Sequence, residues 1–289
     1  MLFSTQTLLT ARTFGILPAV DMLAEAGFTA LDLTFDGEVA EVLKDDYITF
    51  ARQLRAYADA RGVKFIQAHA PFGGGYDFYL GNTVPTFPAM FEVCRILGIG
   101  IVVIHPLLTG RYYGNEQKLF DMNVKFYTAL APLAKKNGVK IGLENMWQRH
   151  PVTRNIVDDV LAPPEELARM YDTLNDPKAF TVCLDLGHVA LCGREPQDAI
   201  RTIGPDRLGT LHVHDVDYVN DLHTIMGGGK LNWDAICRAI GEINYKGSFN
   251  LEADYFLTPL PPELYPDAVK YMARSAKCYS DKVDLYRVD

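Results

Sequence analysis

Five residues that could bind a metal lie within a dozen positions of one another in this chain. They follow or end a short apolar run at residues 207–213, and they are His212, His214, Asp215, Asp221 and His223. Residues two apart on a strand share a face, so His212 and His214 would point the same way. Imidazole and carboxylate groups gathered where a strand ends are suitable ligands for a divalent metal. The alternative is a polar strand end with surface histidines, and the two hypotheses differ in whether other segments supply more ligands.

Other apolar runs end in residues of the same kind. We predict strands at residues 63–68, 99–104, 139–143, 180–184, 207–213 and 247–251 from their short runs of β-branched and apolar residues. These six successive strands end in His69, His105, Glu144, Asp185, His212 and Glu252. A chance distribution would also place ionisable residues in helices and in the middle of strands. The regular placement therefore favours a functional metal site.

The segments between these strands have helical spacing of apolar residues. We predict helices at residues 17–26, 46–61, 85–97, 116–137, 164–174, 196–203, 232–243 and 264–279, and two earlier strands at residues 2–5 and 28–35. Strand and helix thus alternate about eight times, which indicates a parallel sheet. With 289 residues and no break in composition, the chain fits a single (β/α)₈ barrel domain over residues 1–289 better than an open doubly wound sheet.

In such a barrel the strand ends meet at one mouth, where the active sites of this fold lie. No glycine-rich fingerprint follows the first predicted strand. The segment Gly227-Gly228-Gly229-Lys230 lacks the Ser or Thr and the spacing of a P-loop. We therefore expect no nucleotide cofactor.

The composition is that of an ordinary globular protein, with 48% hydrophobic and 22% charged residues. A net charge of −8 argues against nucleic acid as the main partner. The five cysteines form no Cys-x-x-Cys pair, so we expect reduced thiols in a cytoplasmic protein. The N-terminus has no basic region of the signal-peptide type, and the longest apolar stretch, residues 96–108, is too short to cross a membrane.

The strand-end segments resemble the sugar phosphate isomerase/epimerase superfamily. These are xylose isomerase-like TIM barrels that include ketose 3-epimerases and endonuclease IV. The resemblance extends in order from His69 to Glu252, and it rests on Leu143-Glu144-Asn145, Leu184-Asp185-Leu186-Gly187-His188, His212-Val213-His214-Asp215, Asp221-Leu222-His223 and Leu251-Glu252. It implies a single TIM barrel of the xylose isomerase-like type.

The resemblance to the epimerases of this superfamily implies one divalent ion, held by Glu144, Asp185, His212 and Glu252. The two glutamates would double as acid and base, and His188 would contact the substrate. Endonuclease IV implies three zinc ions instead, and this chain has the matching residue type at all nine positions, which are His69, His105, Glu144, Asp185, His188, His212, Asp221, His223 and Glu252.

The chemistry of the four-residue set can also be argued from its donors. Three carboxylates and one imidazole suit Mn²⁺, Mg²⁺ or Co²⁺, with Zn²⁺ as a further option. Such an ion could chelate the carbonyl and neighbouring hydroxyl of a ketose and acidify the C–H between them. Glu144 and Glu252 would address opposite faces of that carbon from different walls of the mouth. Asp185 would be a spectator ligand.

Other residues are candidates for binding the substrate or a second metal ion. His188 could hydrogen-bond the polarised oxygen, or it could be a helix-start residue bonded to backbone. Trp147, His69 and His105 are further candidates for substrate binding. His69, His105, Asp221 and His223 are also a candidate second metal site, because three imidazoles and a carboxylate suit zinc. We expect His214 to be a polar neighbour of the site.

The sequence thus predicts a metal-dependent isomerase or epimerase acting on a sugar or sugar phosphate. An alternative is a zinc phosphodiesterase of the endonuclease IV type, and another is a dehydratase acting on inositol-like polyols with the same metal and bases. A metal-binding protein without catalysis is a third class. The expected partner is a small sugar, with no membrane partner, and a homo-oligomer is left open.

Overall fold

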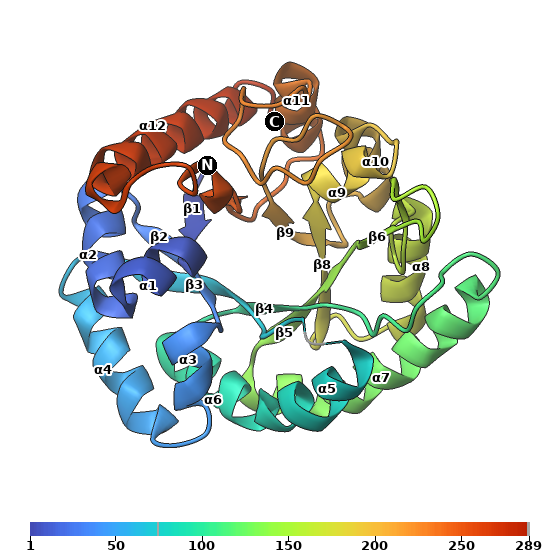
Figure 1. The fold of residues 1–289 in the computed structure, drawn as a ribbon, viewed down its shortest axis with the longest axis horizontal. Helices are drawn as coiled ribbons and strands as arrows, with labels where there is room; N and C mark the ends of the chain where they lie inside the picture. The colour runs from blue at the N-terminus through green and yellow to red at the C-terminus, as the bar shows by residue number, and fades with distance from the viewer. Residues whose placement is uncertain (74, 288–289) are drawn as a thin grey trace.

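Eight parallel strands form a ring in the computed structural model, which describes residues 1–73 and 75–287 (Figure 1). They are β1 (Phe3–Gln6), β2 (Ala30–Thr34), β3 (Lys64–His69), β4 (Ile101–Ile104), β5 (Lys140–Glu144), β8 (Phe180–Asp185), β9 (Leu208–His212) and β10 (Phe249–Leu251). The sheet order is β10-β1-β2-β3-β4-β5-β8-β9. Strands β9 and β10 are joined by a bridge between Val213 and Leu251, and the amide of Val213 donates to the carbonyl of Asn250 at 2.9 Å. The ring is a nearly closed barrel, which confirms the predicted (β/α)₈ fold.

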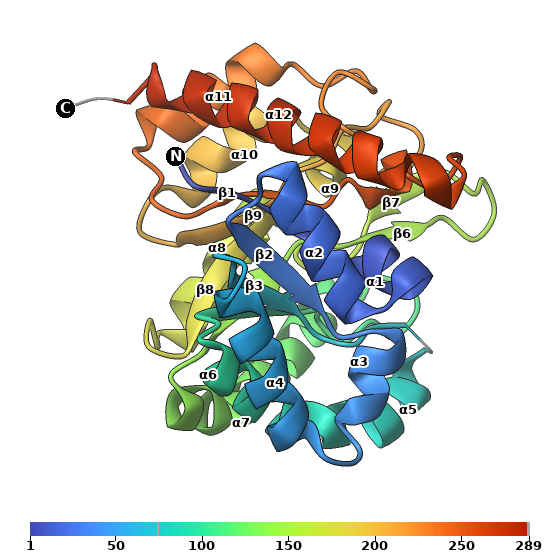
Figure 2. The ribbon, with the colours of Figure 1, turned by 90° about the vertical axis from the view of Figure 1, so that its left-hand side faces the viewer.

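Helices cover the outer surface of the ring (Figures 1 and 2). Those that alternate with the strands are α2 (Ile16–Ala26), α4 (Tyr47–Asp59), α6 (Phe87–Leu97), α7 (Glu116–Asn137), α8 (Pro164–Leu174), α10 (Pro196–Ile203), α11 (Trp233–Glu242) and α12 (Tyr265–Asp284). Each matches a predicted helix, although α12 continues beyond its predicted end at residue 279. Helices α2 and α6 stop at Gly27 and Gly98, whose φ angles of 105° and 80° are left-handed values that glycine adopts without strain.

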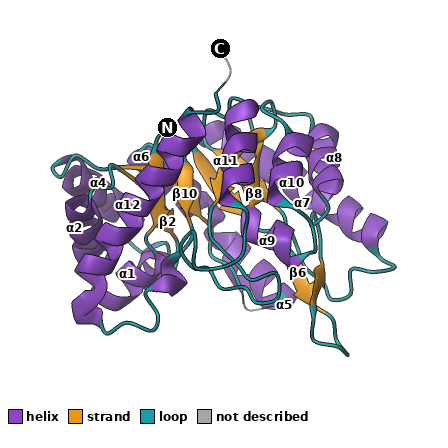
Figure 3. Ribbon diagram, turned by 90° about the horizontal axis from the view of Figure 1, so that it is seen from above, coloured by secondary structure: helices purple, strands orange, loops and turns teal. Residues whose placement is uncertain are grey.

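Several short elements were not predicted. They are α1 (Leu8–Phe14), α3 (Gly37–Val42), α5 (Tyr76–Phe78), α9 (Leu186–Leu191), a π-helix (Tyr79–Thr83), three 3₁₀ turns (Val84–Thr86, Asp254–Phe256, Pro262–Leu264) and an antiparallel hairpin of β6 (Trp147–Arg149) and β7 (Ile156–Asp158). Figure 3 shows α1, α5, α9 and β6 on one side of the barrel, opposite the two chain termini. These insertions therefore surround the end of the barrel toward which the strands run.

Apolar side chains fill the layer between the strands and the helices, with Leu31, Val102 and Leu143 among those fully buried. All five cysteines lie in the described part of the chain and none forms a disulfide, as expected. No helix among residues 1–73 and 75–287 combines the length and apolar character needed to span a lipid bilayer.

The inside of the barrel is polar below the mouth. Asp32 on β2 accepts hydrogen bonds at one carboxylate oxygen, Oδ2, from Gln67 Nε2 at 2.6 Å and from Asn250 Nδ2 at 2.8 Å. The hydroxyl of Ser4 donates to Asn250 Oδ1 at 2.7 Å, and the hydroxyl of Thr210 donates to Gln67. Asp32 Oδ1 is buried without a hydrogen-bond partner among the described residues. Burial raises the pKa of Asp32, because a charged carboxylate loses its hydration there.

The variant Asp32→Asn should make folding stability less dependent on pH. Because the folded pKa of Asp32 is raised above its unfolded value of about 4, the folded protein binds this proton more tightly. The contribution of Asp32 to the free energy of unfolding therefore falls as the pH rises from about 4 to the pKa of Asp32 in the folded protein. Asparagine keeps an oxygen acceptor for Gln67 and Asn250 but does not titrate.

The measurement is urea unfolding of both proteins at a series of pH values from about 4 to about 8. The exposed Asp45, changed to Asn, is the control. Parallel pH profiles for wild type and Asp32→Asn would contradict the argument.

Candidate metal centre at the mouth of the barrel

The six predicted strand-end residues lie at the same end of the barrel. His69, Glu144, Asp185 and His212 are the last residues of their strands, while His105 and Glu252 follow β4 and β10 directly. A cavity of about 230 Å³ opens there. Among the ten predicted site residues, all but Asp185 and His212 line this cavity, and those two are completely buried beneath it. The register of the parallel strands brings residues from six strands together, as the sequence predicted.

Three carboxylates converge on one imidazole nitrogen at the bottom of the mouth. His212 Nδ1 lies 2.8 Å from Glu144 Oε1, 3.1 Å from Glu252 Oε2 and 3.9 Å from Asp185 Oδ2. Each of the four residues offers one ligand atom, and these atoms lie within 4.8 Å of one another. Buried carboxylates this close repel one another unless a cation lies between them. We call Glu144, Asp185, His212 and Glu252 the central group.

The electrostatics of the central group favour a bound cation. Burial lowers the pKa of His212, but Cys183, Glu252 and Glu144 raise it more strongly, so its pKa lies well above the usual value. Burial likewise raises the pKa of Glu144, while His212 and His105 lower it well below its usual range. Glu144 Oε2 is buried, and although His105 Nε2 lies 3.1 Å away, no hydrogen bond of good geometry reaches it from the described residues. An imidazole with three oxygen donors therefore fits a divalent ion.

A second set of ligand atoms borders the central group through Glu144. His105 Nε2 lies 3.1 Å and His69 Nε2 lies 3.7 Å from Glu144 Oε2, and the two Nε2 atoms are 3.1 Å apart. His69 Nδ1 bonds to the carbonyl of Ala70 at 2.8 Å, which favours a proton on Nδ1 and leaves Nε2 free to bind a ligand. Glu144 thus presents Oε1 to the central group and Oε2 to the two histidines.

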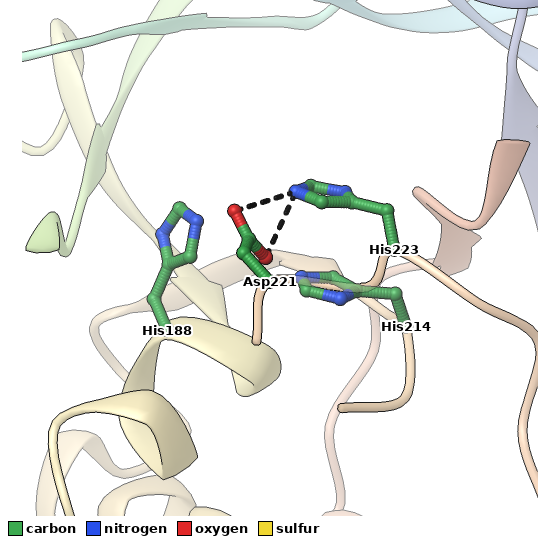
Figure 4. Close-up of side chains that lie close together, drawn as sticks. All are labelled: His188, His214, Asp221 and His223. Atoms are coloured by element: carbon green, nitrogen blue, oxygen red, sulfur yellow. Dashed lines mark hydrogen bonds and ion pairs between the residues drawn. The ribbon is translucent and has the colours of Figure 1, made fainter. Parts of the chain in front are cut away.

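A third set lies on the other side of the mouth and consists of His188, His214, Asp221 and His223 (Figure 4). His223 Nε2 lies 3.2 Å from Asp221 Oδ1, and its ring stacks on that of His214 with centroids 4.0 Å apart. Burial raises the pKa of Asp221, but the hydrogen bond and charge of His223 outweigh it and lower the pKa to about 2. His214 Nε2 lies 3.0 Å from Asp185 Oδ1, which makes it the expected polar neighbour of the central group.

The four residues considered for a second ion are therefore divided between two places. His69 and His105 lie with Glu144, whereas Asp221 and His223 lie with His188 and His214. Within the described residues the predicted quartet does not form one group. The reason is that β3 and β4 lie on a different wall of the barrel from the loop after β9 (Figure 1).

His188 lies in the short helix α9, near its start, as one of the two hypotheses for this residue expected. Asp185 is the N-cap of this helix, because its Oδ1 accepts from the amide of His188 at 2.7 Å. The ring of His188 bonds through Nδ1 to the carbonyl of Asn145 at 2.8 Å and also lines the cavity. The position of His188 is thus compatible with both hypotheses, namely that it bonds to the backbone and that it faces the substrate.

Asn145 and Trp147 connect the site to its surroundings. The side chain of Asn145 accepts from the amide of Asp185 at 2.8 Å and donates to its carbonyl at 3.0 Å, which fixes the end of β5 to the end of β8. Trp147, at the start of the hairpin, donates from Nε1 to Asp221 Oδ2 at 3.2 Å. Asn145 was assigned no role from the sequence, although its place directly after Glu144 was the available signal.

Asp215 has a structural role that the sequence analysis did not predict. Its buried carboxylate accepts hydrogen bonds at 2.8–3.1 Å from the amides of Val216, Gly227 and Leu231 and from Trp233 Nε1. These bonds fold the loop after β9, which carries Asp221 and His223. A Cβ atom at Gly229 would clash with the Asp215 carboxylate and with the Val216 carbonyl. Gly229 is therefore needed for this close approach to Asp215.

Gly229→Ala should lower the free energy of unfolding by about 1–3 kcal/mol, since the added methyl group must displace Asp215 or the backbone. Gly100→Ala is the matched control, because a Cβ there meets nothing within 4 Å. Urea unfolding followed by tryptophan fluorescence measures both variants, and Trp233 reports on the Asp215 contacts directly. Equal destabilisation by the two substitutions would contradict this role for Gly229.

Three comparisons place the chain among known proteins. A probable endonuclease 4 of Staphylococcus saprophyticus subsp. saprophyticus is 28% identical over 213 residues, which are 65% of this chain and 65% of that protein. The structure of a D-tagatose 3-epimerase-like protein superposes with a TM-score of 0.71 at 22% identity, covering 94% of this chain and 99% of that one. The structure of an IolI protein with a zinc atom superposes with a TM-score of 0.72 at 22% identity over the whole of both chains.

The two structural similarities establish the fold, which agrees with the nearly closed barrel described above. The family model of the xylose isomerase-like TIM barrel matches residues 20–275, a range that includes every residue of the three ligand groups. On this evidence, the chain belongs to the xylose isomerase-like TIM barrel family.

Proposed function

We propose that this protein is a metal-dependent isomerase or epimerase that acts on a sugar or sugar phosphate. The observation that carries the proposal is the position of the two glutamates. Glu144 Oε1 and Glu252 Oε2 approach the same imidazole nitrogen, at 2.8 Å and 3.1 Å, from strands β5 and β10. Two carboxylates that meet from different walls can act on opposite faces of one carbon atom. The similarity to a D-tagatose 3-epimerase-like structure supports the same assignment.

The central group would hold one divalent ion, which could be Mn²⁺, Mg²⁺, Co²⁺ or Zn²⁺. When bound, the ion would act as a Lewis acid on the carbonyl and the neighbouring hydroxyl of a ketose. Asp185 is well suited to a purely structural ligand role. It is fully buried and held by Asn145, His188 and His214, so it has no freedom to reach a substrate carbon.

The two glutamates perform the proton transfers in this mechanism. One removes the proton from the carbon next to the carbonyl, and the other returns a proton to the opposite face, which inverts the carbon. In an aldose–ketose isomerisation, the returned proton goes to the neighbouring carbon instead. His69, His105 and His188 would hydrogen-bond the sugar hydroxyls, and the half-buried Trp147 would pack against the ring. All four of these residues line the cavity.

The size of the cavity favours a small substrate. At about 230 Å³, it lies below the range of roughly 300–1,000 Å³ that holds drug-sized ligands. One monosaccharide fits such a volume, and the histidines offer the many polar partners that a polyol needs. The net charge of −8 is unfavourable for binding a long phosphate backbone.

A second candidate is a phosphodiesterase of the endonuclease IV type. One specific observation favours it, which is that Glu144 borders both the central group and the His69–His105 pair. With the His188, Asp221 and His223 set beside them, the mouth has ligands for more than one ion, and neighbouring ions can act together in phosphoryl transfer. The 28% identity to a probable endonuclease 4 supports this candidate. A polyol dehydratase would use the central group in the same way as an epimerase.

Asp185→Ala and His212→Ala should each remove most of the bound divalent metal from the purified protein, since each deletes a buried donor of the central group. His150→Ala is the control, because His150 belongs to none of the ligand groups. Elemental analysis measures the metal content, and anomalous scattering above and below the zinc edge places each ion. Wild-type metal content in both central variants would contradict the four-ligand site. Two or three zinc ions that share Glu144 would favour the phosphodiesterase over the epimerase.

Incubation with a ketose in D₂O should incorporate deuterium at a carbon next to the carbonyl. Glu144→Gln and Glu252→Gln should each slow the exchange by roughly 10²–10⁴-fold, because glutamine cannot accept the proton. The exposed Glu263, changed to Gln, is the control. A panel of ketoses and ketose phosphates is followed by NMR. Absence of exchange across the panel, together with cleavage of abasic DNA, would select the second candidate.

A further inference from the structure

His214 is a completely buried imidazole that takes no part in the proposed proton transfers. Its Nε2 atom lies 3.0 Å from Oδ1 and 3.1 Å from Oδ2 of Asp185. Because both of these neighbours are acceptors, the ring proton is favoured on Nε2, which then donates to the carboxylate. The other ring nitrogen, Nδ1, is buried and has no hydrogen-bond partner in the described part of the chain. His214 therefore acts on Asp185 through Nε2.

The two oxygens of Asp185 have different surroundings. Oδ1 accepts from the amide of His188 at 2.7 Å as well as from His214. Oδ2 lies 3.9 Å from His212 Nδ1, the nitrogen at the centre of the central group. His214 Nε2 is almost equally far from both oxygens, so it opposes rotation of the carboxylate. Oδ2 is thereby kept toward the central group.

The ring of His214 is itself held by its neighbours (Figure 4). It stacks on His223 with centroids 4.0 Å apart and an angle of 6° between the ring planes. The ring of His188 meets it edge-on, with a centroid distance of 6.1 Å. These contacts, together with complete burial, leave little room for the ring of His214 to turn away from Asp185.

Gly187 provides the space that this ring occupies. A Cβ atom at Gly187 would lie 2.0 Å from Cε1 and 2.5 Å from Nε2 of His214, and real Cβ atoms essentially never come within 3.0 Å of another atom. Gly187 lies in helix α9 and does not have a positive φ angle. Glycine is a poor helix former, so the backbone gives no reason for a glycine here. The reason is the close approach of His214.

We propose that His214 is a positioning residue for the central metal ion, which holds Asp185 with Oδ2 toward the ion, and that Gly187 is required for this arrangement. The assignment rests on the proposed function, because it assumes a divalent ion at the central group. Without His214, Asp185 would have to be ordered when the ion binds, and this ordering would weaken binding. Loss of a side chain that holds a metal ligand typically lowers metal affinity roughly 10–100-fold.

Metal binding to four forms of the protein tests this role without relying on turnover. Mn²⁺ is the probe, because carboxylate oxygens suit it better than imidazoles do, and the EPR signal of free Mn²⁺ gives the dissociation constant of metal-depleted protein. His214→Ala should raise this constant roughly 10–100-fold. His214→Gln should stay close to wild type, because its amide nitrogen can take the place of Nε2. His214→Asn should behave like His214→Ala, because its amide nitrogen takes the place of Nδ1.

The glutamine variant also separates positioning from direct metal binding by His214. A glutamine amide nitrogen can donate to Asp185, but it has no free lone pair for a divalent ion. Equal dissociation constants in the glutamine and asparagine variants would therefore overturn the role proposed for Nε2.

Gly187→Ala tests the same contact from the other side. The added methyl group should displace the ring and raise the Mn²⁺ dissociation constant, whereas in the His214→Ala background it should have little further effect, because the ring is already absent. Gly100→Ala is the control, since a Cβ there meets nothing within 4 Å. Additive effects of Gly187→Ala and His214→Ala would contradict the contact. If Gly187→Ala does not fold, the glutamine and asparagine variants still decide the question.

The possible outcomes separate this inference from the proposed function. Wild-type Mn²⁺ affinity in His214→Ala would overturn the positioning role even if the enzyme exchanges protons on ketoses. The expected order of affinities, without exchange on any ketose, would support the positioning role and overturn the proposed function.

Discussion

The convergence of three carboxylates on His212 Nδ1 is the constraint on which the rest of the mouth depends. Side chains of like charge are brought together where Glu144 and Asp185 are buried and Glu252 is mostly covered, so their repulsion is weakly screened. The barrel imposes this arrangement because parallel strands present their carboxyl ends at one face. Glu144 and Glu252 retain access to the cavity, whereas Asp185 lies beneath it. Position within the barrel thus divides otherwise similar carboxylates into two that face the cavity and one that lies beneath it.

Hydrogen bonds to the backbone fix the elements that carry the site. Asn145 joins the ends of β5 and β8, and Asp215 folds the long loop after β9 through three amides and an indole. Asp221 and His223 are therefore presented by a loop with its own internal support. Precise positioning of ligands and bases matters because catalysis is sensitive to displacements of about 1 Å.

For the proposed function, the same set of residues could serve either of two chemistries. Proton transfer on a sugar requires only the central group, with the surrounding histidines free to bind hydroxyls. Phosphodiester cleavage would use the neighbouring imidazoles as ligands for additional ions, with Glu144 shared between groups. For the proposed function, the small cavity at the mouth would favour a compact substrate.

Local patterns in the sequence were enough to predict the barrel, most helix boundaries and the residues at the strand ends. Apolar periodicity and stop signals such as Gly27 and Gly98 act over a few residues, so they can be recognised without a structure. The grouping of ligands could not be predicted in this way, because it depends on which walls of the barrel face each other. For the same reason, only the tertiary structure separated His69 from His223. The role of Asp215 likewise arises from contacts between segments that fold onto one another.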